Sequence, residues 1–207
     1  RPMDKQTQAD QAHAKFDDDK SEFSGYLKLW KWLGDSRGGP STGSGRTDKK
    51  TVRPEPASVR PRPTPVRPEP VEGSSHKLSN RQYENLLREN YVNIRRVREW
   101  RDIHSQLHSV IGEQGWQLND KPASYEQLHL SMLCGLLGNL GFKPEDDEAY
   151  LGARGIKFYR HPGAKLSKKP GRWIVAAELV ETTRLFGRGI ANIEPQWVEQ
   201  VAGHLLK

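Results

Sequence analysis

The sequence lacks the features that disulfide-stabilised and membrane-spanning proteins require. It contains a single cysteine, Cys134, so no disulfide can form within the chain. That thiol lies in the apolar run at residues 133–137, where we expect it to be buried and unreactive. No apolar run approaches the roughly 20 residues that cross a membrane, and no signal-peptide pattern occurs. We therefore expect a cytoplasmic protein with no membrane partner.

Large apolar residues are scarce in one tract, residues 34–73. Hydrophobic residues make up only 34% of the 207-residue chain, and eight of the fourteen prolines fall in this tract. The pattern Val-Arg-Pro-Glu/Arg-Pro recurs there three times at a seven-residue step. Alternate prolines exclude a helix or a central strand and favour polyproline II. We predict a disordered Pro-rich insert at residues 34–77. The strict repeat favours translated repetitive DNA over a docking motif for a proline-binding module.

Helical patterns lie on both sides of this tract. Apolar residues at three- and four-residue spacing predict helices within residues 10–33, with a break at the acidic run 17–19. The same spacing predicts helices at residues 79–111, with a break near 90–91, and at residues 125–140. Each of these last two begins with a serine that is followed three residues later by glutamine, which is a capping-box pattern. The sequence therefore predicts a helical bundle before residue 145.

The remainder of the chain is strand-like and basic. Between Gly152 and Gly189 it carries nine basic and two acidic side chains, so its net charge of 9 − 2 = +7 equals that of the whole protein. Basic residues alternate with apolar and aromatic ones, which gives a small sheet one hydrophobic and one cationic face. Such a face suits a phosphate backbone. We predict an α+β fold in which the helical bundle precedes a small five-stranded barrel of the oligonucleotide-binding (OB) kind.

Several longer motifs resemble one known family. Residues 90–107, which contain Asn-Tyr-Val-Asn and Arg-Glu-Trp-Arg-Asp-Ile-His-Ser-Gln-Leu, resemble the helical ratchet segment of bacterial DEAH-box ATP-dependent RNA helicases. Residues 150–163, with Tyr-Leu-Gly-Ala-Arg-Gly-Ile-Lys-Phe and His-Pro-Gly, resemble the start of their C-terminal OB-fold. The resemblance continues at residues 178–184 and 193–197. It implies the start of a ratchet region at 1–33, a ratchet bundle at 78–144 and an OB-fold domain at 145–207.

The resemblance implies a function for only part of such an enzyme. In this family two RecA-like motor domains bind ATP and Mg²⁺, whereas this sequence has neither a Gly-x-x-x-x-Gly-Lys-Ser/Thr phosphate loop nor an Asp-Glu-Ala-His box. The chain also begins without methionine, and we expect it to be a portion of a longer protein. We expect a monomeric accessory region that holds single-stranded RNA, contacts the motor domains, needs no cofactor itself and lacks ATPase activity alone. The alternative is a non-catalytic OB-fold module that docks a regulatory protein or a ribosomal component.

The candidate RNA-binding residues combine cations with one aromatic ring. The cations would bind phosphates, although exposed helix charges that pair locally are an equally simple interpretation for the arginines near residue 95. Phe158 or its neighbour Tyr159 would stack on a base, and strand alternation lets only one of the two point outward. The residues are Arg95, Arg98, Arg154, Lys157, Phe158, Arg160, Lys165, Lys168, Lys169, Arg172 and Arg184.

Other patterns that could carry chemistry are weak. His104 and His108 have the spacing of a metalloprotease pair, but serine stands where the general-base glutamate should be. The acidic run at residues 145–148 is more typical of a solvated loop than of a metal site. We therefore expect no catalytic residue and no metal in this chain.

Overall fold

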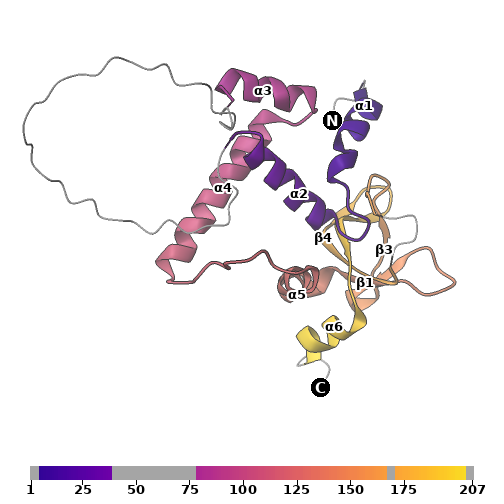
Figure 1. The fold of residues 1–207 in the computed structure, drawn as a ribbon. Helices are drawn as coiled ribbons and strands as arrows, with labels where there is room; N and C mark the ends of the chain where they lie inside the picture. The colour runs from indigo at the N-terminus through magenta and orange to yellow at the C-terminus, as the bar shows by residue number, and fades with distance from the viewer. Residues whose placement is uncertain (1–4, 39–77, 167–170, 204–207) are drawn as a thin grey trace, which may run out of the picture.

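The computed structural model describes residues 5–38, 78–166 and 171–203 (Figure 1). Most of the predicted disordered insert lies outside these ranges, as do Lys168 and Lys169. Within them, helices precede a closed five-stranded barrel, so the predicted α+β class and the order of its two parts are confirmed. No helix in the described ranges is long and apolar enough to cross a membrane.

The N-terminal helices break where the acidic run predicts. Helix α1 (Gln6–His13) leads through the 3-10 turn η2 (Ala14–Phe16) into an extended segment. Helix α2 (Glu22–Asp35) then begins, because the Ser21 side chain accepts a hydrogen bond from the Ser24 amide and so caps the helix. Helix α2 includes Gly34, which we had assigned to the insert. That assignment was wrong because the apolar residues before Gly34 pack as one face of α2 up to the buried Leu33. The helix then continues through Gly34 and ends at Asp35.

Two further helices complete the bundle. Helix α3 (Asn80–Glu89) and helix α4 (Ile94–Glu113) are separated at Tyr91, whose φ of 54° ends the regular helix as the sequence predicted. The capping box predicted for α3 is present, and a second one begins α5 (Tyr125–Leu136). A buried cluster joins α2 to α3 and α4; it consists of Leu33, Tyr83, Leu87 and Val97. In Figure 1 the C-terminal half of α4 extends away from the barrel.

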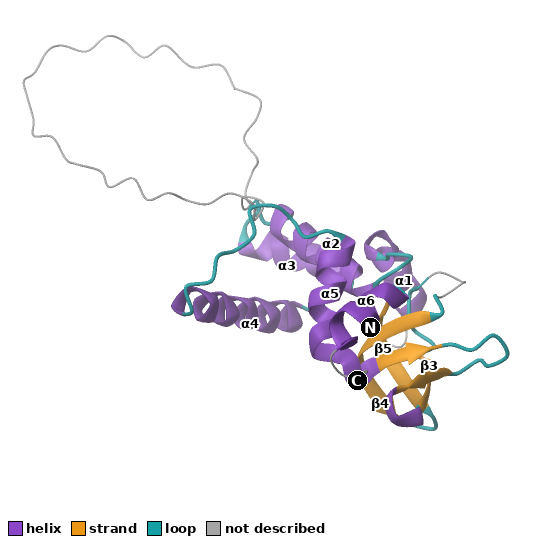
Figure 2. Cartoon of the chain, turned by 90° about the horizontal axis from the view of Figure 1, so that it is seen from below, coloured by secondary structure: helices purple, strands orange, loops and turns teal. Residues whose placement is uncertain are grey.

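The barrel has the strand order β1-β2-β3-β5-β4. Its strands are β1 (Leu140–Phe142), β2 (Tyr150–Gly152), β3 (Lys157–Arg160), β4 (Trp173–Glu181) and β5 (Leu185–Asn192). The only parallel pair among them is β3 with β5, which closes the barrel. The 3-10 turn η4 (Ala153–Gly155) joins β2 to β3, and helix α6 (Pro195–Ala202) follows β5 beside α5 (Figure 2).

Strand β1 corrects the prediction of a helix up to Leu140. The helix ends at Leu136, a 3-10 turn η3 (Leu137–Asn139) follows, and Leu140 already pairs with Val175 of β4. The reason is a close approach at Gly141, where a Cβ atom would lie 2.5 Å from Cζ of Phe158. Only glycine lets the backbone pass the ring at this distance. Strand β1 lies ahead of residue 145, where we predicted the OB-fold part to begin.

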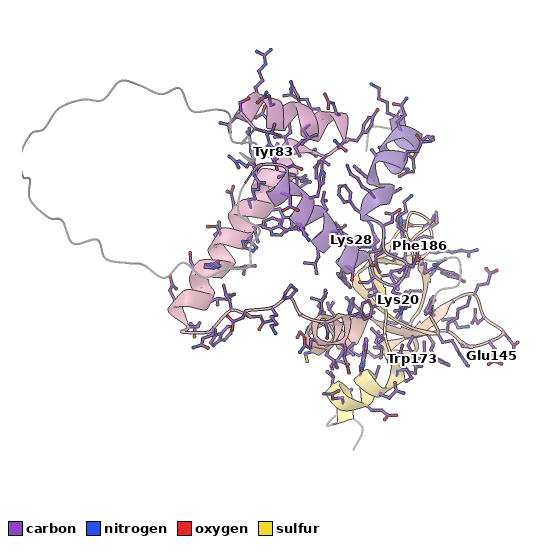
Figure 3. The ribbon with its side chains drawn as sticks, viewed as in Figure 1. Lys20, Lys28, Tyr83, Glu145, Trp173 and Phe186 are labelled. Atoms are coloured by element: carbon purple, nitrogen blue, oxygen red, sulfur yellow. The ribbon has the colours of Figure 1, made fainter. Side chains whose placement is uncertain are left out.

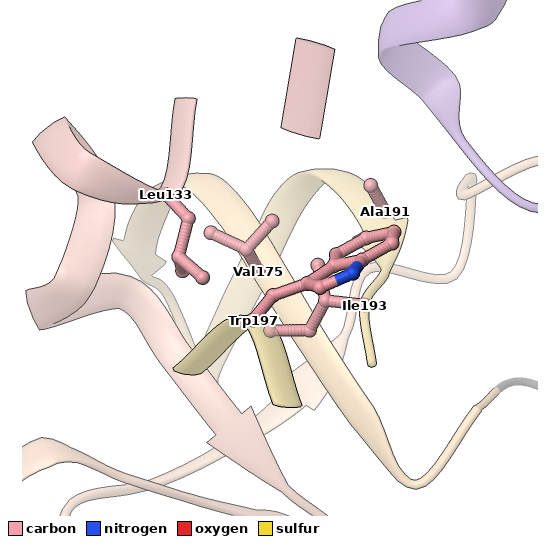
Figure 4. Close-up of a cluster of buried hydrophobic side chains, with 5 residues drawn as sticks. All are labelled: Leu133, Val175, Ala191, Ile193 and Trp197. Carbon is pink, nitrogen blue, oxygen red and sulfur yellow. The ribbon is translucent and has the colours of Figure 1, made fainter. Parts of the chain in front are cut away.

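Strand β4 has buried residues on both of its faces. Ile174 points into the barrel, where it packs with Tyr150, Phe158 and Ile190. Its neighbour Val175 points the other way, because successive side chains of a strand face opposite sides. On that outer side α5 and α6 cover the barrel, and the cluster there consists of Leu133, Val175, Ala191, Ile193 and Trp197 (Figure 4). Cys134, which we expected to be buried here, is instead exposed, because α5 turns Leu133 inward.

The N-terminal segment is fastened to the barrel at the start of α2. The Asn192 amide donates to the Lys20 carbonyl at 2.8 Å, and Ser21 forms an isolated bridge with Ala191. The Glu22 carboxylate accepts from the Ile190 amide at 2.8 Å and from the Lys165 amide at 3.2 Å. Helix α2 therefore connects the barrel to α3 and α4, as Figure 1 shows.

Candidate nucleic-acid interface

The two candidate arginines of α4 lie on its exposed surface in ion pairs. Arg95 Nε is 3.1 Å from Glu99 within the same helix, and Arg98 is 2.6 Å from Glu84 of α3. Exposed pairs of this kind contribute at most about 1 kcal/mol, so a phosphate can replace the carboxylate. The local pairing that we considered for these arginines is therefore present, and their contact with RNA stays a prediction.

Two candidate cations of the barrel are bound by its acidic loop. The loop between β1 and β2 places Asp147 at 2.7 Å from Lys157 Nζ and Glu145 at 3.1 Å from Arg172. The hydrogen bond from Lys157 lowers the pKa of the Asp147 carboxyl and raises the pKa of the lysine. The loop that we expected to be merely solvated thus partly neutralises the cationic surface.

Arg154 and Arg160 lie at two further positions around the barrel. Arg154 is exposed in turn η4 and has a φ of 57°, which is uncommon for a residue other than glycine. Arg160 is half-buried at the end of β3. Burial raises the pKa of Tyr150, and the positive charge of Arg160 opposes this rise. Because side chains alternate along a strand, Arg160 lies on the same side of β3 as the buried Phe158 and opposite to Tyr159.

Lys165 has a structural role in the joint between α1 and the barrel. Its Nζ atom is 3.6 Å from Asp10 of α1, and its backbone amide donates to Glu22 of α2. Only about a third of its side chain is exposed, at 34%. A phosphate would have to compete with these contacts.

Phe158 was wrongly predicted as a base-stacking residue. Its exposed fraction is 0%, and it fills the centre of the barrel with Tyr150, Ile174 and Ile190. Because successive side chains of a strand point to opposite faces, Tyr159 is the outward member of the pair. The prediction that only one of the two rings points outward is therefore confirmed, but the local sequence did not indicate which ring would face the core.

A second group of side chains surrounds Tyr159; it includes the predicted Arg184, whereas Phe186 and His161 were missed in the sequence. The parallel register of β3 and β5 pairs Tyr159 with Phe186, and their ring centroids are 6.4 Å apart. The His161 ring meets the Phe186 ring edge-on at 6.0 Å. Arg184, in the turn between β4 and β5, lies with its guanidinium carbon 4.9 Å from the Tyr159 ring centroid. Only the parallel pairing brings Phe186 here, and no local pattern signals that pairing.

The predicted cations do not converge on one face of the barrel. Arg172 lies with its guanidinium 5.2 Å from the Phe142 ring, beside an open groove of about 830 Å³ between the barrel and α5–α6. Trp173 also lines this groove, and Figure 3 shows it apart from Phe186, which lies on the side of the barrel nearest α1. Tyr159 and Arg184 belong with Phe186. The surface of β3 and β5 is therefore separate from the groove.

The structure also reduces the charge excess that the sequence suggested. Among the described residues between Gly152 and Gly189, at least four cations form ion pairs, and three of these four carboxylate partners lie outside that segment. The pairs are Lys157 with Asp147, Lys165 with Asp10, Arg172 with Glu145, and Arg188 with Glu178. The cationic face is therefore weaker than the +7 of the isolated segment implies.

Comparison with known proteins agrees with this architecture. Residues 128–205 match a family described as an oligonucleotide/oligosaccharide-binding (OB)-fold. Together with the closed barrel of five strands, this match establishes an OB-fold domain. The domain includes α5 and α6, which cover the outer side of β4.

The whole chain is also similar to specific helicases. It is 38% identical over all 207 residues to the ATP-dependent RNA helicase HrpA of Escherichia coli, and 33% identical over the same length to the HrpA homolog of Haemophilus influenzae. HrpA of Borreliella burgdorferi is 24% identical over 119 residues. The chain spans only 13% of the length of the first two relatives. These matches confirm the resemblance to HrpA-type RNA helicases over one portion of their length.

Proposed function

We propose that this chain is an accessory region of an ATP-dependent RNA helicase and holds single-stranded RNA for the motor domains. The observation that carries the proposal is an OB-fold barrel whose β3–β5 surface exposes Lys157, Arg184 and Arg188. OB-folds commonly bind oligonucleotides through the second and third strands and the loop between the fourth and fifth. Lys157 and Arg184 occupy these elements. The similarity to proteins named as RNA helicases makes RNA the preferred ligand.

The ion pairs on this surface would make the binding of RNA weak at each contact and easily reversible. A phosphate that approaches Lys157 competes with the partly exposed carboxylate of Asp147, which is already 2.7 Å away. The net gain per contact is then small, and most of it comes from release of the counterions condensed on the RNA. A strand held by several such contacts can move from one register to the next. This property suits RNA that a motor pulls along.

A separate surface supports contact with other domains of a longer protein. Helix α4 exposes Ile103, Leu107 and Val110, with exposed fractions of 54%, 59% and 49%. Their spacing places them on one side of the helix, so they form a continuous apolar stripe. We propose that the RecA-like motor domains cover this stripe, because such a stripe on a monomer usually marks an interface.

Salt-dependent binding of RNA by the purified chain tests the proposal. We expect single-stranded RNAs of different sequence to bind with similar affinity. The logarithm of the binding constant should fall linearly with the logarithm of salt concentration, with a slope of about −0.7 for each phosphate contacted. ATP hydrolysis should be absent with and without RNA, because the sequence contains no phosphate loop. A chain that binds no RNA at any salt concentration would instead favour the protein-docking module.

A further inference from the structure

We propose that Tyr159, Phe186 and His161 form a nucleobase-stacking surface on the barrel, and that Arg184 binds the phosphate beside the stacked base. This inference rests on the proposed function and specifies it. It proposes that the surface binds RNA through its bases as well as through its phosphate backbone. Base stacking is sequence-tolerant, since every nucleobase has an aromatic face. It therefore suits a protein that must accept many RNA sequences.

The register of β3 and β5 builds the surface. Tyr159 and Phe186 are direct partners across the parallel pair, so their rings lie next to each other on the outer side of the barrel. His161 follows β3 by one residue, and its amide donates to the Gly187 carbonyl at 3.0 Å. This hydrogen bond continues the ladder and keeps the imidazole against the edge of Phe186. The rings of Tyr159 in β3, Phe186 in β5 and His161 just after β3 thus form one contiguous aromatic area.

These rings do not fill the barrel core. Phe158 and Leu185, the neighbours of Tyr159 and Phe186 along their strands, pack inside the barrel. Tyr159, His161 and Phe186 point outward and are only half-buried, so each keeps part of its ring in contact with solvent. A single exposed ring needs no explanation, but three contiguous rings on a sheet of small area point to a ligand with an apolar face.

Arg184 is fixed over the same area. The Thr182 amide and hydroxyl both bond to the Arg184 carbonyl, at 3.0 and 3.4 Å, which tightens the turn between β4 and β5. The guanidinium then lies over the Tyr159 ring. Lys157 and Arg188 on this side have carboxylates within ion-pair distance, whereas Arg184 forms no ion pair with any described residue. Its charge is therefore available for a phosphate, and its planar group can also stack on a base.

The test separates stacking from charge with matched variants of the full chain. Tyr159→Leu and Phe186→Leu keep apolar bulk but remove the ring, and Tyr159→Phe keeps the ring. We expect each leucine variant to bind a single-stranded oligouridylate about 5- to 150-fold more weakly at an unchanged salt slope, since stacking involves no counterions. Tyr159→Phe should bind as the parent does. Arg184→Gln should reduce the magnitude of the salt slope by about 0.7.

A fluorescent base reports stacking without any substitution in the protein. We expect the emission of 2-aminopurine within the oligonucleotide to be quenched further when the parent chain binds, and less so with the leucine variants. Tyr26→Leu is the control, because Tyr26 is 57% exposed on α2 and its ring packs against Trp100 of α4 and not against the three rings of the barrel. If the parent chain binds RNA but shows no change in emission, or if the leucine variants bind as tightly as Tyr26→Leu, the stacking inference is overturned. The proposed function would still stand, and it fails only if the parent binds no RNA.

Discussion

The Ser21 hydroxyl donates a hydrogen bond to His129 Nε2 across 2.6 Å, although the two residues are 108 positions apart in the chain. His129 Nδ1 is 2.6 Å from the Tyr125 carbonyl, which can only accept, so the proton of the neutral ring is on Nδ1. Both side chains are fully buried, and the Ser21 oxygen also caps α2. This bond therefore links the start of α2 to α5 beside the barrel. Burial and the capping role make it a structural pair and not a catalytic one.

The Ser21–His129 pair predicts that stability depends on pH. Burial lowers the pKa of His129, and its hydrogen bond to the Tyr125 carbonyl opposes the change only in part. The unfolded chain then binds more protons than the folded one just below the ordinary histidine pKa of about 6.5. The contribution of His129 to the free energy of unfolding is therefore fully present above that pH, and it is lost as the pH decreases below it. Urea unfolding between pH 5 and pH 8 measures this loss.

Variants of two histidines identify the source of the effect. His129→Gln should remove most of the pH dependence of the unfolding free energy in the range between the pKa of His129 in the folded state and its pKa in the unfolded state. The reason is that the variant lacks the imidazole that titrates in this range. His108→Gln is the matched control, since His108 is exposed on α4. An equal pH profile for the parent and His129→Gln would show that another group controls the dependence.

Ser21→Ala should destabilise the protein more than loss of a cap alone. The substitution leaves the Ser24 amide without its acceptor and the buried His129 Nε2 without its donor. A lost cap costs about 0.5–2 kcal/mol, and a buried unsatisfied group adds about 1–3 kcal/mol. Ser79→Ala is the control, because Ser79 caps α3 at an exposed site and has no buried partner. Comparable losses of unfolding free energy in the two variants would argue against a role for the histidine contact.

The sequence predicted local features of this fold well and pairings between distant segments poorly. The capping boxes at Ser79 and Ser124 and the break at Tyr91 depend on neighbouring residues, and all three were found. Strand β1 was missed because three residues carry no periodicity, and its only signal is contact with β2 and β4. Phe186 was missed for a similar reason, since its place beside Tyr159 depends on the parallel closure of the barrel.

The same distinction applies to the charges. Most of the candidate cations are exposed, but the sequence could not show that Asp10, Glu145 and Asp147 would lie against three of them. Ion pairs between elements depend on the tertiary fold. The roles of the individual cations in RNA binding therefore remain predictions.

Gly141→Ala should disturb the barrel because it adds a Cβ atom where none fits. That atom would lie 2.5 Å from Phe158 Cζ and 3.0 Å from Tyr150 Cβ, in the centre of the core. Overpacking of a core costs about 1–3 kcal/mol, so the midpoint of thermal unfolding should fall. Gly138→Ala has no atom within 4 Å of the added carbon and should change stability little. A midpoint for Gly141→Ala as high as that of Gly138→Ala would mean that the barrel adjusts at no cost.

Asp147→Asn should strengthen RNA binding, because the acidic loop competes with phosphates for Lys157. Asparagine keeps the oxygen that accepts from the Ala149 amide at 3.0 Å, so the loop retains its shape. It loses the charge that holds Lys157 Nζ at 2.7 Å. In the parent, Asp147 competes for this lysine and the phosphate contact forms only part of the time, so the freed lysine should gain up to one full contact and the salt slope should steepen by up to about 0.7. Asp146→Asn removes the same charge from an exposed residue with no ion pair among the described residues, and it should leave the slope unchanged. Equal slopes for the two variants would mean that the loop acts only through its total charge and that Lys157 does not contact the RNA.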